Sequence, residues 1–138
     1  MTEPPTLHHI AMGAADVERV SAFWRDLIGL PERMRHHRDD GTVRSIWLGL
    51  GSESVLMIES LDVERQPLEG PVIGQGPFLI ALAVQEDEYA GMVRRLREAG
   101  CRVEASTPHT TYVRDPEDNR AAVSHYPLGR RGHDGSRD

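Results

Sequence analysis

The side chains in this sequence that are best suited to acid–base chemistry are histidines and carboxylates close to predicted strands. The chain has seven histidines, and imidazole is the side chain that most readily titrates near neutral pH. His109 stands just before a predicted strand, which makes it a candidate acid or base, with solvent exposure in a loop as the alternative. Glu59, at the end of another predicted strand, is either a second candidate base or a structural partner for an arginine.

Sulfur chemistry and the common nucleophile motifs have little support. Cys101 is the only cysteine, which excludes an internal disulfide framework and a cysteine-rich zinc site. The sequence contains no glycine-rich phosphate loop, no GxSxG elbow and no HExxH pair. Nucleotide binding and serine hydrolysis are therefore disfavoured.

The composition is that of a small acidic domain. The chain has 138 residues, of which 38% are hydrophobic and 28% charged, and its formal net charge of −6 disfavours a nucleic-acid partner. No apolar run reaches the roughly 18 residues that span a bilayer, and residues 1–5 lack the features of a signal peptide. We therefore expect a cytoplasmic protein without a membrane partner.

The first 59 residues are predicted to form a strand, a helix and three further strands. Apolar residues recur at helical spacing between Asp16, a candidate N-cap, and Gly29, which is well placed to end the helix. Alternating apolar patterns and turn signals predict the strands. They cover residues 7–12, 32–38, 43–50 and 55–59.

The second half of the chain repeats this order. A helix is predicted to begin at Asp87 as a cap and to end at Gly100. Strands are predicted over residues 78–84, 101–105, 110–114 and 119–125. Ile10 aligns with Ile80, 70 positions later, and Gly29 aligns with Gly100, 71 positions later. The sequence therefore contains an internal repeat of two similar halves.

The repeat predicts the domain organisation. The first module covers residues 1–59, a linker follows over 60–76, and the second module covers 77–126. The glycine-rich, charged tail over 127–138 is predicted to be disordered. The two modules together are expected to form one domain.

This pattern predicts an α+β fold in which two βαβββ modules form a curved mixed sheet around a cleft, with the helices outside. One helix covers only one face of a four-stranded sheet, so the two modules must pair. Inward-facing residues of alternating strands would then line the cleft. Trp47, Met57 and Phe78 are candidates for its wall, with core or dimer contacts as the alternative.

Two motifs carry a resemblance to a known family. Residues 9–30 contain HIAM, DVER and FWRDLIGL, and residues 114–120 read RDPEDNR. They resemble the opening strand and helix, and the turn before the last strand, of the vicinal oxygen chelate superfamily. That superfamily includes glyoxalase I, bleomycin resistance proteins, extradiol dioxygenases, fosfomycin resistance proteins and methylmalonyl-CoA epimerase. The resemblance covers about residues 7–126, with Asp118 at a position where glycine is usual, and Arg114 is expected to pair with Asp115.

The resemblance implies four positions for the ligands of a divalent metal. His9 occupies the first, and Met57 occupies the second, with Glu59 as a displaced substitute two residues on. The other two fall on Leu79 and Ala122, whose side chains cannot bind a metal. Two ligands are fewer than the three that a catalytic site requires. We therefore expect no cofactor, with zinc, nickel, iron or manganese as the alternative.

The resemblance to the bleomycin resistance branch, which binds its drug without metal catalysis, implies that this chain binds a small organic molecule in the cleft between its modules. Five residues are the candidate ligand-binding residues: Trp47, Met57, Phe78, Leu79 and Ala122.

The alternative is a metal-dependent lyase, isomerase or dioxygenase. In that alternative, His9 and Glu59 would be joined by His109 or by a side chain from a second copy. A homodimer is expected in either case, because it is common in the superfamily and would bury the open sheet edges.

Overall fold

The computed structural model describes residues 4–61 and 77–128, and in them the predicted order of elements occurs twice. The first module contains strand β1 (His9–Ala14), helix α1 (Val17–Ala22), π-helix η1 (Phe23–Ile28), and strands β2 (Glu32–His37), β3 (Val43–Leu50) and β4 (Ser54–Ser60). The second contains β5 (Ile80–Ala83), α2 (Glu86–Glu98), β6 (Val103–Ser106), β7 (Thr110–Arg114) and β8 (Arg120–Ser124). Residues 62–76 of the linker predicted over 60–76, and residues 129–138 of the tail predicted over 127–138, lie outside the described residues.

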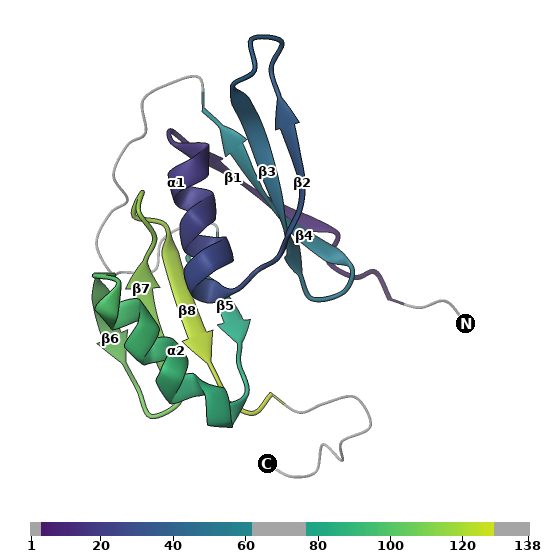
Figure 1. Ribbon diagram of the computed structural model, residues 1–138. Coiled ribbons are helices and arrows are strands. Elements are labelled where there is room, and N and C mark those ends of the chain that lie inside the picture. The colour runs from purple at the N-terminus through teal and green to yellow at the C-terminus, as the bar shows by residue number, and fades with distance from the viewer. Residues whose placement is uncertain (1–3, 62–76, 129–138) are drawn as a thin grey trace.

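Each module forms its own four-stranded sheet. The strand orders are β1-β4-β3-β2 and β5-β8-β7-β6, with the first strand of each module parallel to the last and the remaining pairs antiparallel. The predicted α+β fold of two βαβββ modules is confirmed. Among the described strands, the mixed sheet is divided into two sheets that do not join. Helices α1 and α2 lie on the same side of the two sheets (Figure 1).

The helix of the first module begins and ends at the predicted residues. The Asp16 carboxylate accepts a hydrogen bond from the Arg19 amide at 3.0 Å, and Gly29 ends the helix in the left-handed region, with φ of 102°. The amides of Gly29 and Leu30 both donate to the carbonyl of Trp24, so the second half of the helix is widened into η1.

In the second module the predicted cap is wrong. Gln85 is the N-cap of α2, and Asp87 lies in the first turn, where its negative charge favours the positive end of the helix dipole.

One hydrophobic core lies between the helices and both sheets. Strands β3 and β4 contribute fully buried residues that include Ile46, Leu48 and Ile58. Val20 and Trp24 cover them from α1 and η1. Leu96 of α2 and residues of β7 and β8 belong to the same buried cluster, so the two modules share one core.

The turn over residues 115–119 joins the second module to the first. Asp115 Oδ2 accepts a hydrogen bond from Trp24 Nε1 at 3.0 Å, and the Glu117 carboxylate accepts from the amides of Ala15 and Asp16 at 2.8 and 2.7 Å. Between the helices, the Arg95 guanidinium of α2 donates twice to the Leu27 carbonyl of η1. These contacts fix the two sheets relative to each other.

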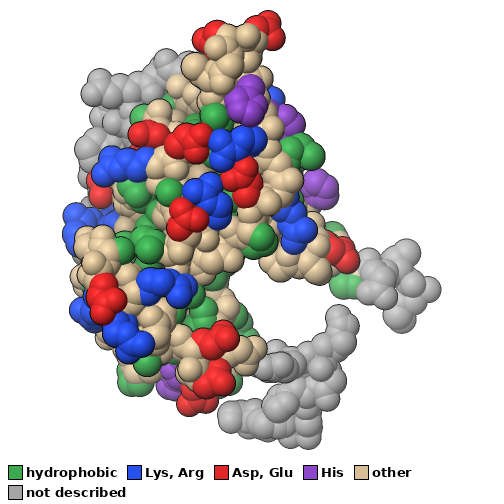
Figure 2. Space-filling model, viewed as in Figure 1, with side chains coloured by type: hydrophobic (Ala, Val, Ile, Leu, Met, Phe, Trp, Pro, Cys, Tyr) green, Lys and Arg blue, Asp and Glu red, His purple; other side chains and the backbone are tan. Residues whose placement is uncertain are grey.

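The helix side carries mixed charge, with acidic and basic side chains next to one another (Figure 2). Four ion pairs connect α1, η1 and β2 in the order Glu18, Arg35, Glu32, Arg25 and Asp26, with N···O distances of 2.7 to 3.0 Å. In the part of the chain that is described, no helix has the length and apolar character needed to cross a bilayer.

Candidate ligand-binding face

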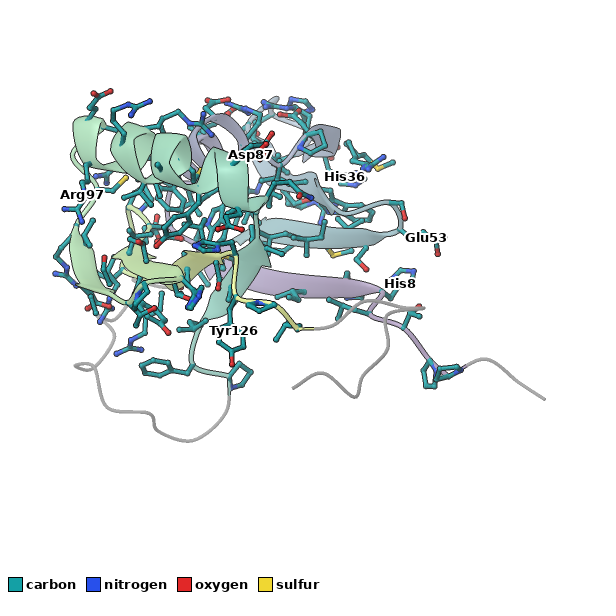
Figure 3. All side chains as sticks on the ribbon, turned by 90° about the horizontal axis from the view of Figure 1, so that it is seen from below. His8, His36, Glu53, Asp87, Arg97 and Tyr126 are labelled. Atoms are coloured by element: carbon teal, nitrogen blue, oxygen red, sulfur yellow. The ribbon has the colours of Figure 1, made fainter. Side chains whose placement is uncertain are left out.

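The side of each sheet away from the helices is the place for a ligand site, because the helix side is filled by the core. In β1, Ile10 and Met12 pack against that core, so His9, Ala11 and Gly13 point to the opposite side. We call this helix-free side face 1 on the sheet of β1 to β4, and face 2 on the sheet of β5 to β8. Figure 3 shows α2 above the strands and Tyr126 below them, on the helix-free side.

Face 2 carries a cavity of about 330 Å³. It is lined by Phe78, Leu79, Glu104, Ala105, Tyr112, Arg120 and Ala121. Most of this lining is apolar, and the Arg120 guanidinium stands over the Phe78 ring, with 4.2 Å between Cζ and the ring centroid. Ala122 is buried beside the cavity, paired with Ala81 on one strand and Tyr112 on the other. Three of the predicted ligand-binding residues are thus placed together.

Trp47, Met57 and Glu59 lie together on face 1. Met57 pairs with Trp47 on one side and Ala11 on the other, and Glu59 occupies the next outward position along β4. Trp47 Nε1 donates to Glu59 Oε2 at 3.3 Å. Glu59 therefore binds an indole rather than the arginine that was the structural alternative.

His9 and Glu59 are on the same face but are not neighbours. His9 pairs with Val55, four positions before Glu59 on β4, so the strand rise separates their backbones by about 13 Å. The ring of exposed His9 instead meets the ring of His8, with 3.0 Å between the two Nδ1 atoms.

His109 lies away from both groups. Its ring contacts the rings of His125 and Tyr126, where β7 begins and β8 ends. The face 2 cavity is at the other end of these strands, where Arg114 pairs with Arg120. The structure therefore does not bring His109 to Glu59 or to the cavity.

Sequence reasoning missed two residues of face 1, His36 and Ser45. They pair with each other across β2 and β3, and Ser45 also pairs with Glu59. The ring of His36 packs against Trp47, with 4.9 Å between ring centroids. The Asp39-Asp40-Gly41 turn indicates a hairpin here, but regular pairing from His37 and Val43 would place His36 opposite Arg44. Only the register shift between His36 and His37 brings His36 opposite Ser45.

A second hollow, of about 460 Å³, lies on the helix side between η1 and the turn after β7. Its lining includes Phe23, Cys101, Arg102, Arg114 and Asp118. Arg114 Nε lies 2.9 Å from Glu104 Oε2, an ion pair without the alignment of a hydrogen bond. Arg102 Nη2 lies 3.9 Å from Asp118 Oδ1. Burial raises the pKa of the Cys101 thiol. Paired charges and a protonated thiol make this hollow the weaker candidate, despite its size.

The fold, two βαβββ modules with a helix-free side, places the chain in the vicinal oxygen chelate superfamily. Within it, the chain belongs to the glyoxalase-like domain family, whose sequence model matches residues 9–124. No curated protein matches the chain by sequence.

Solved structures share the fold at low identity. A mutant fosfomycin resistance protein FosX from Listeria monocytogenes, complexed with Mn(II) and a dihydroxypropylphosphonic acid, has a TM-score of 0.70 at 15% identity, covering 91% of this chain and 96% of its own. A glyoxalase/dioxygenase from Nostoc punctiforme has a TM-score of 0.71 at 15% identity, covering 86% and 88%. FosX from Mesorhizobium loti has a TM-score of 0.66 at 12% identity, covering 93% and 95%.

The side chains on the helix-free faces do not fit the superfamily's metal. Of the four implied positions, His9 alone carries a metal-binding side chain, while Met57, Leu79 and Ala122 offer no nitrogen or carboxylate. Glu59 is too far along β4 to share an ion with His9. Within residues 4–61 and 77–128, no three His, Cys, Asp or Glu side chains are grouped to hold a metal.

Proposed function

We propose that this chain binds a small organic molecule on the helix-free side of its sheets, without the divalent metal of its superfamily. The observation that carries the proposal is the cavity on face 2. Its volume of about 330 Å³ falls in the range of small-molecule sites, and an apolar lining with a few polar groups is typical of them. Phe78, Leu79 and Tyr112 supply the apolar contacts, and Arg120 and Glu104 supply polar groups that orient a ligand.

A fragment screen by two-dimensional amide NMR tests this proposal. We expect binding fragments to shift the amides of Ala81, Ala105 and Tyr112 on face 2. A Leu79→Glu variant should weaken binding by at least about tenfold, because it places a charge in the apolar lining. Leu7→Glu is the matched control, since Leu7 is exposed outside the cavity. Shifts confined to Cys101 and Arg102 would move the site to the helix-side hollow and contradict the proposal.

Metal analysis tests the second part of the proposal, that binding needs no divalent metal. Protein purified without chelator is expected to hold less than stoichiometric zinc, nickel, iron or manganese, and chelator treatment should leave fragment binding unchanged. Stoichiometric metal that is lost in a His9→Ala variant would overturn metal-independent binding and favour the lyase, isomerase or dioxygenase alternative.

We also propose that the chain is a homodimer. Two open sheets leave strand edges that a second copy can cover. Light scattering should then give twice the chain mass of 15.4 kDa, and a mass of one chain would count against the dimer. The cytoplasmic location stays a prediction.

A further inference from the structure

Glu59 is a half-buried carboxylate without a cationic partner among the described residues. Its Oε2 accepts one hydrogen bond, from Trp47 Nε1, and Glu59 belongs to none of the ion pairs in residues 4–61 and 77–128. A carboxylate that is partly removed from water without a cation is unfavourable. A ligand of positive charge would relieve this penalty.

The surroundings of Glu59 suit an organic cation. Trp47 lies beside it and is packed against the His36 ring at an interplanar angle of 63°. Met34 and Met57 pair with Trp47 on its two sides, and Met34 is 48% exposed. Aromatic rings attract cations, and methionine side chains adapt to apolar groups of varied shape.

Two further polar atoms lie in the same cross-strand row as Glu59. Ser45 is fully buried, and its Oγ has no hydrogen-bond partner; the buried Nε2 of His36 also has none. The row runs from His36 through Ser45 to Glu59. A hydroxyl oxygen and a neutral imidazole nitrogen can each accept a hydrogen bond from an N–H group.

Face 1 offers an anionic ligand fewer available cationic groups. The Arg33 side chain lies over Gly49, four positions along β3 from Ser45, and its Nη2 donates to the Gly51 carbonyl. Arg33 is thus engaged at the far end of the strand. The Arg38 guanidinium, which donates to Ser60 Oγ next to Glu59, is also engaged, by Thr42 Oγ1 and the Val43 carbonyl. The formal net charge of −6 also favours the approach of a cation over an anion.

We propose that face 1 selects an organic cation, with an ammonium group at Glu59 and an apolar, ring-bearing body against Trp47, Met34 and Met57. This inference rests on the proposed function, because it extends ligand binding on the helix-free side from the face 2 cavity to face 1 and specifies the ligand class there. The ammonium N–H groups donate to the free Glu59 oxygen, and the ring contacts the indole.

Benzylammonium, benzyl alcohol and benzoate separate charge from shape, because they carry the same ring. In amide and indole NMR titrations of the full chain, benzylammonium is expected to shift the Trp47 Nε1–H signal and to bind at least about tenfold more tightly than benzyl alcohol or benzoate. Added salt should weaken benzylammonium binding.

Glu59→Gln is the decisive variant, since it keeps the shape and an oxygen that can accept from Trp47. It should weaken benzylammonium binding at least about tenfold and leave benzyl alcohol binding unchanged. Glu53→Gln, at an exposed residue of the β3–β4 turn, is the matched control and should bind like the unchanged chain. Unchanged amide spectra of the two variants without ligand will show that both are folded.

The outcomes distinguish this inference from the proposed function. If benzoate or benzyl alcohol binds face 1 as tightly as benzylammonium, or Glu59→Gln binds benzylammonium normally, cation selection is wrong while small-molecule binding stands. If neither these probes nor the fragment screen shifts any residue of face 1 or face 2, the proposed function fails as well.

Discussion

The indole N–H of Trp24, in the first module, donates a hydrogen bond to the carboxylate of Asp115, in the second, across 91 positions of the chain. Both side chains are buried. The other carboxylate oxygen of Asp115 accepts from the amides of Glu117 and Asn119. One side chain therefore shapes a turn and also holds two halves of the protein together.

Trp24→Phe should lower the free energy of unfolding by about 1.5 to 3 kcal/mol, because it removes one of the two donors to a buried, charged acceptor and leaves Asp115 Oδ2 with the Asn119 side-chain amide alone. Chemical denaturation followed by circular dichroism measures this loss. Trp47→Phe is the matched control: Trp47 is half-buried, its hydrogen bond is longer, and the expected loss is below about 1 kcal/mol. Equal losses in the two variants would contradict a special role for the Trp24–Asp115 contact.

Glu32 should make the folded state sensitive to acid. Hydrogen bonds from Arg35 and then Arg25 lower the pKa of this carboxyl from its ordinary 4.5. Because the pKa is lower in the folded state, the stabilisation is present above the unfolded pKa and is lost as the pH falls through the folded one.

Replacing Glu32 by Gln should reduce stability at neutral pH by less than about 1 kcal/mol, since the pairs are near the surface. The difference from the unchanged chain should shrink as the pH drops below 4.5. Denaturation series at neutral and acidic pH measure both effects. A difference that is constant with pH would show that the charge of Glu32 is not its cause.

Cys101 should react slowly with alkylating reagents. Burial raises the pKa of its thiol above the ordinary 9.0, so little thiolate is present near neutral pH. Mass spectrometry after iodoacetamide treatment should show alkylation at least about tenfold slower in the native chain than in denaturant. Equal rates would mean that the native thiol is neither shielded nor shifted.

Asp118→Gly should stabilise the turn of residues 115–119. Asp118 has φ of 69°, in the left-handed region where a side chain is unfavourable. We expect a gain of about 0.5 to 1 kcal/mol with glycine and a loss of at least about 1 kcal/mol with valine. The ion pair with Arg102 that glycine removes is long and exposed, and so contributes little. Denaturation midpoints in the reverse order would contradict this account.

Local patterns in the sequence were enough for most of the fold. The predicted strands over 43–50 and 110–114 coincide with β3 and β7, because alternating residues between clear turn signals leave little choice of register. Gly29 and Gly100 both end helices at positive φ, as their spacing in the repeat predicts.

Contacts between distant segments could not be predicted in this way. Arg114 was expected to pair with Asp115, its neighbour, but its charge lies against Glu104 while Asp115 binds Trp24. The widened helix η1 was also missed, because its apolar spacing resembles that of an α-helix and only the shared Trp24 carbonyl distinguishes the two.

The candidate site was predicted in part. Phe78 and Leu79 line the face 2 cavity, and Trp47, Met57 and Glu59 share face 1. His36 was missed, because its face depends on register shifts near Arg33 and His37 that the alternation does not reveal.

The pairing of each first strand with its own last strand makes the order of the two halves in the chain interchangeable. No described strand of one module hydrogen bonds to a strand of the other. A circularly permuted gene that begins at Pro77, joins the two old ends with a new linker and finishes at Leu61 would preserve every described strand pair. The modules would still meet through Trp24 and Asp115, so the architecture belongs to the two units and their contact, whichever is synthesised first.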